Sequence, residues 1–286
     1  MTERGLPITF RRRIFALGGA GLALGAAILF AFAMLALVAP WLDLPAPEAM
    51  DLSARLAPPS RAHPLGTDQL GRDMLARLIG GIPVSLGSAV SAVGLIAVIA
   101  LPWGLVAGLA GGRVDMVMMR LADIFLAFPS LVLALAVIGF MGASLEASVI
   151  GVAAAWWPAL ARLVRSLVLS AAERDFVRAA RLCGASPLRI VGRHILPQVL
   201  PPLAVILSLE VASVLLALSS LSFLGIGAQA PTPEWGAMLN AARPFFAQAP
   251  ALLLAPGLAV VLAVLAFNLI GEGLREMLDE RKPYQW

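Results

Sequence analysis

Few side chains in this sequence could carry out covalent or metal chemistry. Cys183 is the only cysteine, Lys282 the only lysine, and His63 and His194 are the only histidines. A phosphate-binding loop of the Walker type needs Gly-Lys-Ser/Thr, but proline follows Lys282. One cysteine can form neither an intrachain disulfide nor a cysteine metal cluster. We therefore expect a non-enzymatic chain with no catalytic residue, metal site or cofactor of its own. If ATP and Mg²⁺ drive its function, another subunit binds them.

Two hydrolase motifs are missing from the chain, namely the zinc-protease helix HExxH and the serine nucleophile turn GxSxG. An intramembrane hydrolase is an open alternative because serine is plentiful, but no nucleophile and base can be named. An ion-coupled secondary transporter would need a relay of charges within the membrane, and Glu210 stands nearly alone in its apolar stretch.

A carboxylate in the middle of a membrane span costs roughly 2.5–3.5 kcal/mol on insertion scales. Glu210 therefore either faces a water-filled translocation path or the partner subunit, or is a protonated or locally hydrogen-bonded structural residue. Trp157 is a second candidate for the path, with packing against lipid or another subunit as its alternative.

The composition is that of a membrane protein. Hydrophobic residues make up 60% of the 286 residues and charged residues 13%, and the mean hydropathy is +0.91. Soluble domains have about 50% apolar and about 25% charged residues. The net charge of +4 is explained by arginines in cytoplasmic loops, without nucleic acid as a partner. We predict an all-α protein embedded in a lipid bilayer.

Apolar blocks of about 20 residues are long enough to cross a hydrocarbon core of roughly 30 Å. Six transmembrane helices are expected on this basis, with Pro129 bending the third and a short amphipathic helix over residues 68–78 preceding the second. The first block is too long for a signal peptide and is expected to be retained. The expected spans are 14–38, 84–110, 121–141, 145–163, 200–224 and 251–270.

The predicted parts of the chain are residues 1–83 with the first helix and an extracytoplasmic loop, a five-helix core over 84–273, and a cytoplasmic tail over 274–286. With both termini in the cytoplasm, 16 of the basic residues fall inside and five outside. This asymmetry predicts an N-in, C-in topology.

Three charged residues before the second span could form a surface ion-pair cluster that docks an extracytoplasmic protein: Asp68, Arg72 and Asp73. Trp235, between the last two spans, is expected to anchor its loop at the membrane interface. Asp123 is expected to pair with Arg120, three residues earlier on the same helix.

The segment between the fourth and fifth spans has the signals of two capped helices. A run of helix formers ends at Gly184, which suits the left-handed geometry after a helix. Ser186 then provides a good N-cap, and Pro187 suits the first helical position. We expect a second helix over 188–196, stopped by Pro197. Either this segment is a basic loop that merely satisfies the orientation rule, or it is a rigid protrusion that docks a partner.

The string FVRAARLCGASPLRIVGRHILP (176–197) resembles the cytoplasmic signature loop of bacterial ABC importer permeases, in which an EAA run is followed by glycine and an I-LP ending. Its glutamate falls on Arg178, which leaves a specific salt bridge to the ATPase in doubt. Three further blocks look like the second permease of dipeptide, oligopeptide and nickel importers: residues 63–81, 119–135 and 221–243. The resemblance covers nearly the whole chain, and residues 1–60 contribute least.

This resemblance implies a type I ABC importer permease fold with a cytoplasmic coupling helix, in a bacterial inner membrane. It implies a homologous second permease, two cytoplasmic ATPase subunits and an extracytoplasmic substrate-binding protein as partners. The implied cargo is a di- or oligopeptide, with nickel or a metal chelate as the alternative. The residues implied to seat in the ATPase are Arg178, Ala179, Ala180, Gly184, Ala185, Ser186, Pro187, Leu188 and Arg189.

Overall fold

The computed structural model describes the backbone of residues 8–279 and the side chains of residues 19–278. Over this range the secondary structure is helical, apart from one isolated β-bridge between Thr67 and Asp73. The α-helices are α1 (Ile8–Val38), α2 (Met74–Ala110), α3 (Gly112–Leu126), α4 (Ser130–Met141), α5 (Leu145–Ala172), α6 (Asp175–Leu182), α7 (Pro187–Ile190), α8 (Leu196–Phe223), α9 (Trp235–Ala242) and α10 (Ala251–Asp279).

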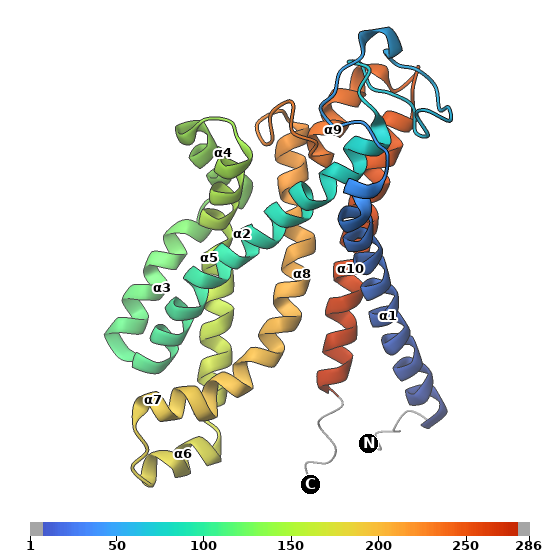
Figure 1. Ribbon diagram of the computed structural model, residues 1–286. Coiled ribbons are helices and arrows are strands. Elements are labelled where there is room, and N and C mark those ends of the chain that lie inside the picture. Colours follow the sequence, from blue (N-terminus) through green and yellow to red (C-terminus); the bar gives the residue numbers. More distant parts are fainter. Residues whose placement is uncertain (1–7, 280–286) are drawn as a thin grey trace.

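Five helices in the described range are long and apolar enough to cross a membrane, or six if α3 and α4 are counted as one broken span. The predicted all-α membrane fold is thereby confirmed. Figure 1 shows α6 and α7 at one end of the molecule, and the loop before α2 together with α9 at the other. We call these the α6 end and the α9 end.

Small residues let the long helices approach closely. A Cβ added to Gly104 of α2 would lie 2.6 Å from the carbonyl oxygen of Ala161 on α5. A Cβ added to Gly25 of α1 would lie equally close to the carbonyl oxygen of Ala266 on α10, and Figure 1 shows these two helices side by side. Interfaces of this kind are typical of helices packed in lipid, where backbone approach replaces the hydrophobic driving force.

Several predicted helix boundaries differ from the structure. Pro129 separates α3 from α4 at an angle of 82° instead of bending one helix, since proline has no N–H to donate and disfavours the α conformation in the residue before it. The predicted surface helix over 68–78 is wrong, because α2 begins only at Met74 and runs without a break to Ala110. The predicted boundary at residue 83 therefore falls inside α2.

Pro197 does not stop the helix before it. A π-helical turn, Val191–Ile195, follows α7 and leads directly into α8, with Pro197 in the first turn of α8. Because a π turn shifts the hydrogen-bond register by one residue, it can accommodate a proline without ending the helix. The elements from Pro187 to Phe223 consequently form one continuous helical segment, which curves from α7 into α8 (Figure 1).

Candidate functional site

The turn between α6 and α7 is built by local backbone chemistry. Gly184 has a φ of +79°, and the N–H of Ala185 donates to the carbonyl of Ala180 at 3.1 Å, an ending that favours glycine. The Ser186 hydroxyl then accepts from the N–H of Arg189 at 3.4 Å, with Pro187 in the first helical position. The predicted ending at Gly184 and the predicted caps at Ser186 and Pro187 are confirmed.

This turn protrudes from the molecule while its base is held firmly. Val177 and Ile195 are fully buried, and Ile190 is nearly so. At the tip, Leu182 is 89% exposed and Leu188 is 86% exposed, and a Cβ added to Gly184 would meet nothing within 4 Å. The structure therefore presents two bare leucines on a rigid base.

The remaining residues predicted for this segment surround the two leucines. Ala180 and Ala185 are half-buried on the inner side of the turn. The other predicted residues are exposed to solvent, namely Arg178, Ala179, Gly184, Ser186, Pro187 and Arg189. Neither Arg178 nor Arg189 takes part in a side-chain ion pair with another described residue. The surface of the turn thus combines apolar tips with free positive charge.

The turn is connected directly to two spans. On one side α5 ends at Ala172 and α6 begins at Asp175; on the other side α7 passes through the π turn into α8. Figure 1 shows α6 and α7 as an elbow at the base of α5 and α8. A displacement of the elbow would therefore act on both helices at once.

Two ion pairs tie α3 to α5 near the same end. The guanidinium of Arg165 donates to both carboxylate oxygens of Asp115 at 2.5 Å, and Arg162 pairs with Asp123. The predicted pairing of Asp123 with Arg120 is therefore wrong. Spacing along one helix suggested Arg120, whereas the packing of α3 on α5 brings Arg162 to the carboxylate.

Glu210 and Trp157 have different surroundings. Glu210 is half-buried in α8, and among the described residues its carboxylate has no hydrogen bond or ion pair. Trp157 is 6% exposed, and its ring packs edge-on against Trp103 and Phe125, with centroids 4.9 and 5.4 Å apart. We therefore assign Trp157 to packing between α2, α3 and α5 instead of to a translocation path.

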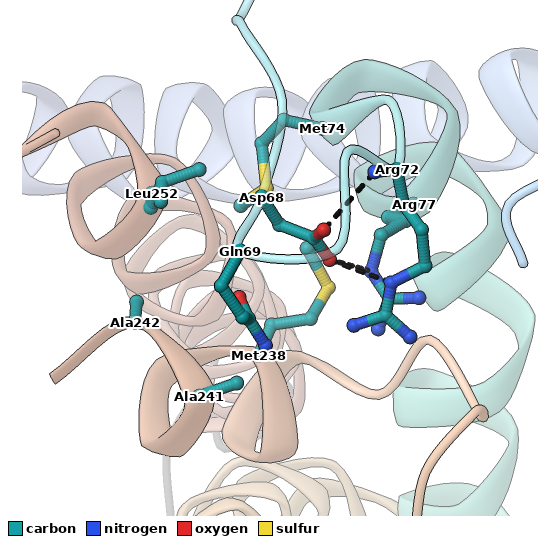
Figure 2. Close-up of a pocket in the computed structure, with 9 residues that line it drawn as sticks. All are labelled: Asp68, Gln69, Arg72, Met74, Arg77, Met238, Ala241, Ala242 and Leu252. Atoms are coloured by element: carbon teal, nitrogen blue, oxygen red, sulfur yellow. Dashed lines mark hydrogen bonds and ion pairs between the residues drawn. The ribbon is translucent and has the colours of Figure 1, made fainter. Parts of the chain in front are cut away.

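The three charged residues predicted to form a surface cluster before α2 are buried, which corrects that expectation. Asp68, Arg72 and Asp73 are between 2% and 5% exposed. Asp73 caps α2 by accepting from the N–H of Ala76 at 2.7 Å and lies 2.9 Å from Nδ1 of His63. These side chains stabilise the conformation of the loop before α2, where the Asp68 carboxylate accepts from Nε of Arg72 at 2.6 Å (Figure 2). Any role they have in docking another protein is therefore indirect, through the surface of that loop.

Trp235 is also buried, although an interfacial position was predicted. It is fully enclosed, and its indole N–H donates to the carbonyl of Leu78 at 3.1 Å. A Cβ added to Gly81 would lie 2.8 Å from the indole ring, so this glycine makes room for the tryptophan. Trp235 consequently locks α9 onto the beginning of α2.

Glu234, which the sequence reasoning missed, completes this lock. This residue is 2% exposed, and its carboxylate accepts from the N–H groups of Gly236 and Ala237 at 2.9 and 2.8 Å. Burial raises the pKa of Glu234, although these hydrogen bonds act to lower it. The sequence carried no signal for this cap, because glutamate is not among the preferred N-cap residue types and the segment was predicted to be a loop.

Comparison with known families identifies this arrangement. Residues 100–283, from the second half of α2 onward, match the family described as "Binding-protein-dependent transport system inner membrane component". This match covers more than half of the chain. The chain belongs to this family. It is a permease subunit of an ABC importer and a multi-pass protein of the bacterial inner membrane.

Known relatives of the permease are named for the transport of different substrates. It is 42% identical to the nickel transport system permease protein NikC of Escherichia coli, over 88% of this chain and 91% of the relative. It is 41% identical to the dipeptide transport system permease protein DppC of Alkalihalophilus pseudofirmus, over 90% and 84%. The probable D,D-dipeptide permease DdpC of Escherichia coli is 37% identical, over 94% and 90%.

A solved structure confirms the fold of the permease. An inward-facing form of the MetNI methionine ABC transporter superimposes with a TM-score of 0.59, covering 73% of this chain and 98% of that chain. The sequence identity is 18%, so this likeness concerns the fold alone.

Proposed function

We propose that the α6–α7 elbow is the element through which separate ATPase subunits drive this permease. The observation that carries the proposal is the pair of bare leucines, Leu182 and Leu188, on a base fixed by buried side chains. Exposed apolar residues on a rigid protrusion, bordered by polar ones, mark a protein contact. Because the elbow is continuous with α5 and α8, a moving partner can change the bundle.

The side of the membrane follows from charge. Assigning the α6 end to the cytoplasm places 16 basic residues there and five on the other side. Six of those 16 lie outside the part of the chain whose side chains the structure describes. Four of them precede residue 19, and two follow residue 279. The seven from Arg162 to Arg193 alone exceed the five at the α9 end, so the assignment does not depend on the termini.

Cys183 provides a direct test of the elbow, because it is exposed beside Gly184 and is the only cysteine in the chain. A membrane-impermeant maleimide should label it in inside-out vesicles but not in intact cells. Assembly with the ATPase subunits should reduce the labelling rate at least about tenfold. A Cys183→Ser, Arg113→Cys variant, with its cysteine in the first turn of α3, is the control and should be labelled equally with and without the ATPase.

Labelling of Cys183 from outside the cell would overturn the topology. Equal labelling with and without bound ATPase would overturn the docking assignment while leaving the topology intact.

The translocation path is proposed to run along the face of α8 that carries Glu210. Ser213 and Ser220, three and ten residues further on, are exposed on the same helix, and their hydroxyls bond to carbonyls of their own helix. An ionisable carboxyl group is costly against lipid, and the two hydroxyls add to the polarity of this face of α8. Such a face is better accommodated by a hydrated path shared with a second permease.

Replacing Glu210 with glutamine should lower uptake roughly tenfold, if its charge contributes about 1.4 kcal/mol to passage of a cationic group. Uptake into proteoliposomes with the complete importer measures this. The control is Glu272→Gln, which removes an exposed carboxylate of α10 that pairs with Arg275. Full uptake by a normally assembled Glu210→Gln variant would remove Glu210 from the path.

Peptides are the proposed cargo, in keeping with two of the three relatives above; nickel, named for the third, is the second candidate. The complete importer is proposed to contain a homologous second permease, two ATPase subunits and an extracytoplasmic binding protein that contacts the α9 end. Titrating the binding protein encoded beside this permease with peptides and with Ni²⁺ separates the two cargo classes.

A further inference from the structure

The two halves of the broken third span are held to the bundle in different ways. The half nearer the α9 end, α4, packs directly on α5: a Cβ added to Gly151 of α5 would lie 2.8 Å from the carbonyl oxygen of Ala134 on α4. The other half, α3, is thinly packed, since only Ala122 of its 15 residues, all of them described, is buried. Elements with few buried contacts belong to the least stable parts of a fold. α3 therefore needs another attachment to keep its place.

Non-helical backbone adjoins α3 at both of its ends. At its start, Gly111 and Gly112 have φ values of +60° and +53°, in a region that favours glycine. At its end, the chain turns by 82° between Leu126 and Ser130 before it continues as α4. Short joints of this kind can serve as hinges. A movement of α2 or of α4 would therefore not force α3 to follow.

Two ion pairs, which we call the α3–α5 clamp, supply the attachment. Arg165 donates through Nε and Nη2 to the two carboxylate oxygens of Asp115, both at 2.5 Å. A bidentate pair of this kind fixes orientation as well as distance. In the second pair, of Arg162 with Asp123, the carboxylate lies eight residues further along α3, about 12 Å on a helix. Attachment at two separated points fixes both the position and the direction of α3 on α5.

Other contacts join α3 to two different helices. The ring of Phe125 meets Trp157 of α5 edge-on, with centroids 5.4 Å apart. The indole N–H of Trp103 on α2 donates to the carbonyl of Met118 at 3.2 Å. These contacts do not determine which of the two helices α3 follows. The clamp does, because both of its pairs lead to α5.

The clamp is close to the elbow along the chain. Arg165 lies seven residues before Ala172, the last residue of α5, which is about two helical turns, or roughly 10 Å. The first residue of α6 is Asp175. A displacement of the elbow would therefore reach the clamp through a short and uninterrupted stretch of helix.

We propose that the clamp makes α5 carry α3 with it during transport. The proposal rests on the function proposed for the elbow, which supplies the movement of α5. The four side chains of the clamp are positioning residues and need not touch the cargo. Without them, the elbow would move α5 and the closely packed α4 but leave α3 behind, so that the third span would not move as a unit.

The first test measures the distance between α3 and α5 in the assembled importer. Spin labels are attached at Ile124→Cys and Ser170→Cys, exposed positions of the two helices, in protein that carries Cys183→Ser. Pulsed EPR should give one narrow distance distribution, unchanged between the nucleotide-free state and the state with ATP trapped on the ATPase subunits. Neutralising the clamp with Asp115→Asn and Asp123→Asn should broaden the distribution even without nucleotide.

A distance that changes with nucleotide while the clamp is intact would overturn the proposal, and so would an equally narrow distribution after neutralisation. The first of these outcomes is measured with the clamp unmodified, so it does not depend on whether the asparagine variant folds. The comparison without nucleotide does not involve the elbow, so the clamp can fail while the function of the elbow stands.

The second test compares uptake with ATP hydrolysis. The neutralised importer should retain its ATPase subunits and hydrolyse ATP, but its uptake per ATP hydrolysed should fall roughly tenfold, within the range typical of coupling between two sites. Exchanging the charges with Asp115→Arg and Arg165→Asp should restore uptake that either change alone removes. The control is Arg120→Gln, which changes an arginine beside the clamp that has no ion pair with another described residue. It should leave uptake unchanged.

Full uptake by the neutralised importer, or a charge exchange that restores nothing, would overturn the clamp. A failure of the elbow would look different, because ATPase subunits would then bind and drive uptake without Leu182 and Leu188.

Discussion

Replacing both Leu182 and Leu188 with glutamate is expected to abolish ATP-driven uptake while the permease stays inserted in the membrane. Both leucines are almost fully exposed at the tip of the elbow, so the change should not disturb the fold. Burying a leucine against a partner contributes about 1.5–3 kcal/mol. Loss of two such contacts, about 3 kcal/mol or more, corresponds to a drop in ATPase affinity of over about a hundredfold.

Three measurements on the purified importer check this prediction: retention of the ATPase on the tagged permease, ATP hydrolysis stimulated by the loaded binding protein, and uptake into proteoliposomes. Arg113→Glu is the matched control, because it adds negative charge to an exposed position at the start of α3, which we also place in the cytoplasm. This control should keep all three activities. A double-leucine variant that retains the ATPase and full uptake would show that the elbow is not the contact.

Deleting residues 185–187 distinguishes the contribution of the rigid geometry of the elbow from that of its exposed leucines. This deletion removes the Ser186 cap and the first residue of α7, and with them the angle between α6 and α7, while it leaves both leucines in the chain. We expect ATP hydrolysis to continue without uptake, because the ATPase still finds the leucines but no longer moves a rigid elbow. The same outcome is expected for a bulky residue at Gly184, whose positive φ strains any side chain.

Trp235→Ala is expected to lower the free energy of unfolding by about 3–5 kcal/mol, as for other fully buried aromatic residues. The change empties a site enclosed by α2, α9 and Phe32 of α1, whose ring centroid is 5.5 Å away. It also leaves the carbonyl of Leu78 without its indole donor. The measurement is thermal unfolding of the permease in detergent.

Trp41→Ala is the matched control, since this tryptophan is 75% exposed at the same end of the molecule. Its replacement should change stability little. Trp235→Phe should fall in between, because it keeps most of the ring but loses the hydrogen bond, worth about 1 kcal/mol. If the Trp235→Ala variant unfolds at the same temperature as the wild type, Trp235 does not hold α9 against α2.

Local sequence patterns were sufficient to predict those features that depend on a few neighbouring residues or on the surrounding lipid. Blocks of apolar residues determined the membrane spans, because a hydrocarbon core demands a helix with all backbone groups paired. Gly184, Ser186 and Pro187 determined the turn of the elbow, since each acts on its own backbone. The two leucines at its tip were visible in the sequence, but their exposure was not.

Tertiary structure decided which partner each polar or aromatic residue meets. Spacing suggested Arg120 for Asp123, yet packing of α3 on α5 supplied Arg162. Asp68, Arg72 and Trp235 read as surface residues and are buried, because the loop before α2 folds over α9. The chain by itself determined an all-helical membrane protein with a capped cytoplasmic elbow. Only the fold decided which charges and rings are enclosed, since burial depends on contacts between segments as far apart as residues 78 and 235.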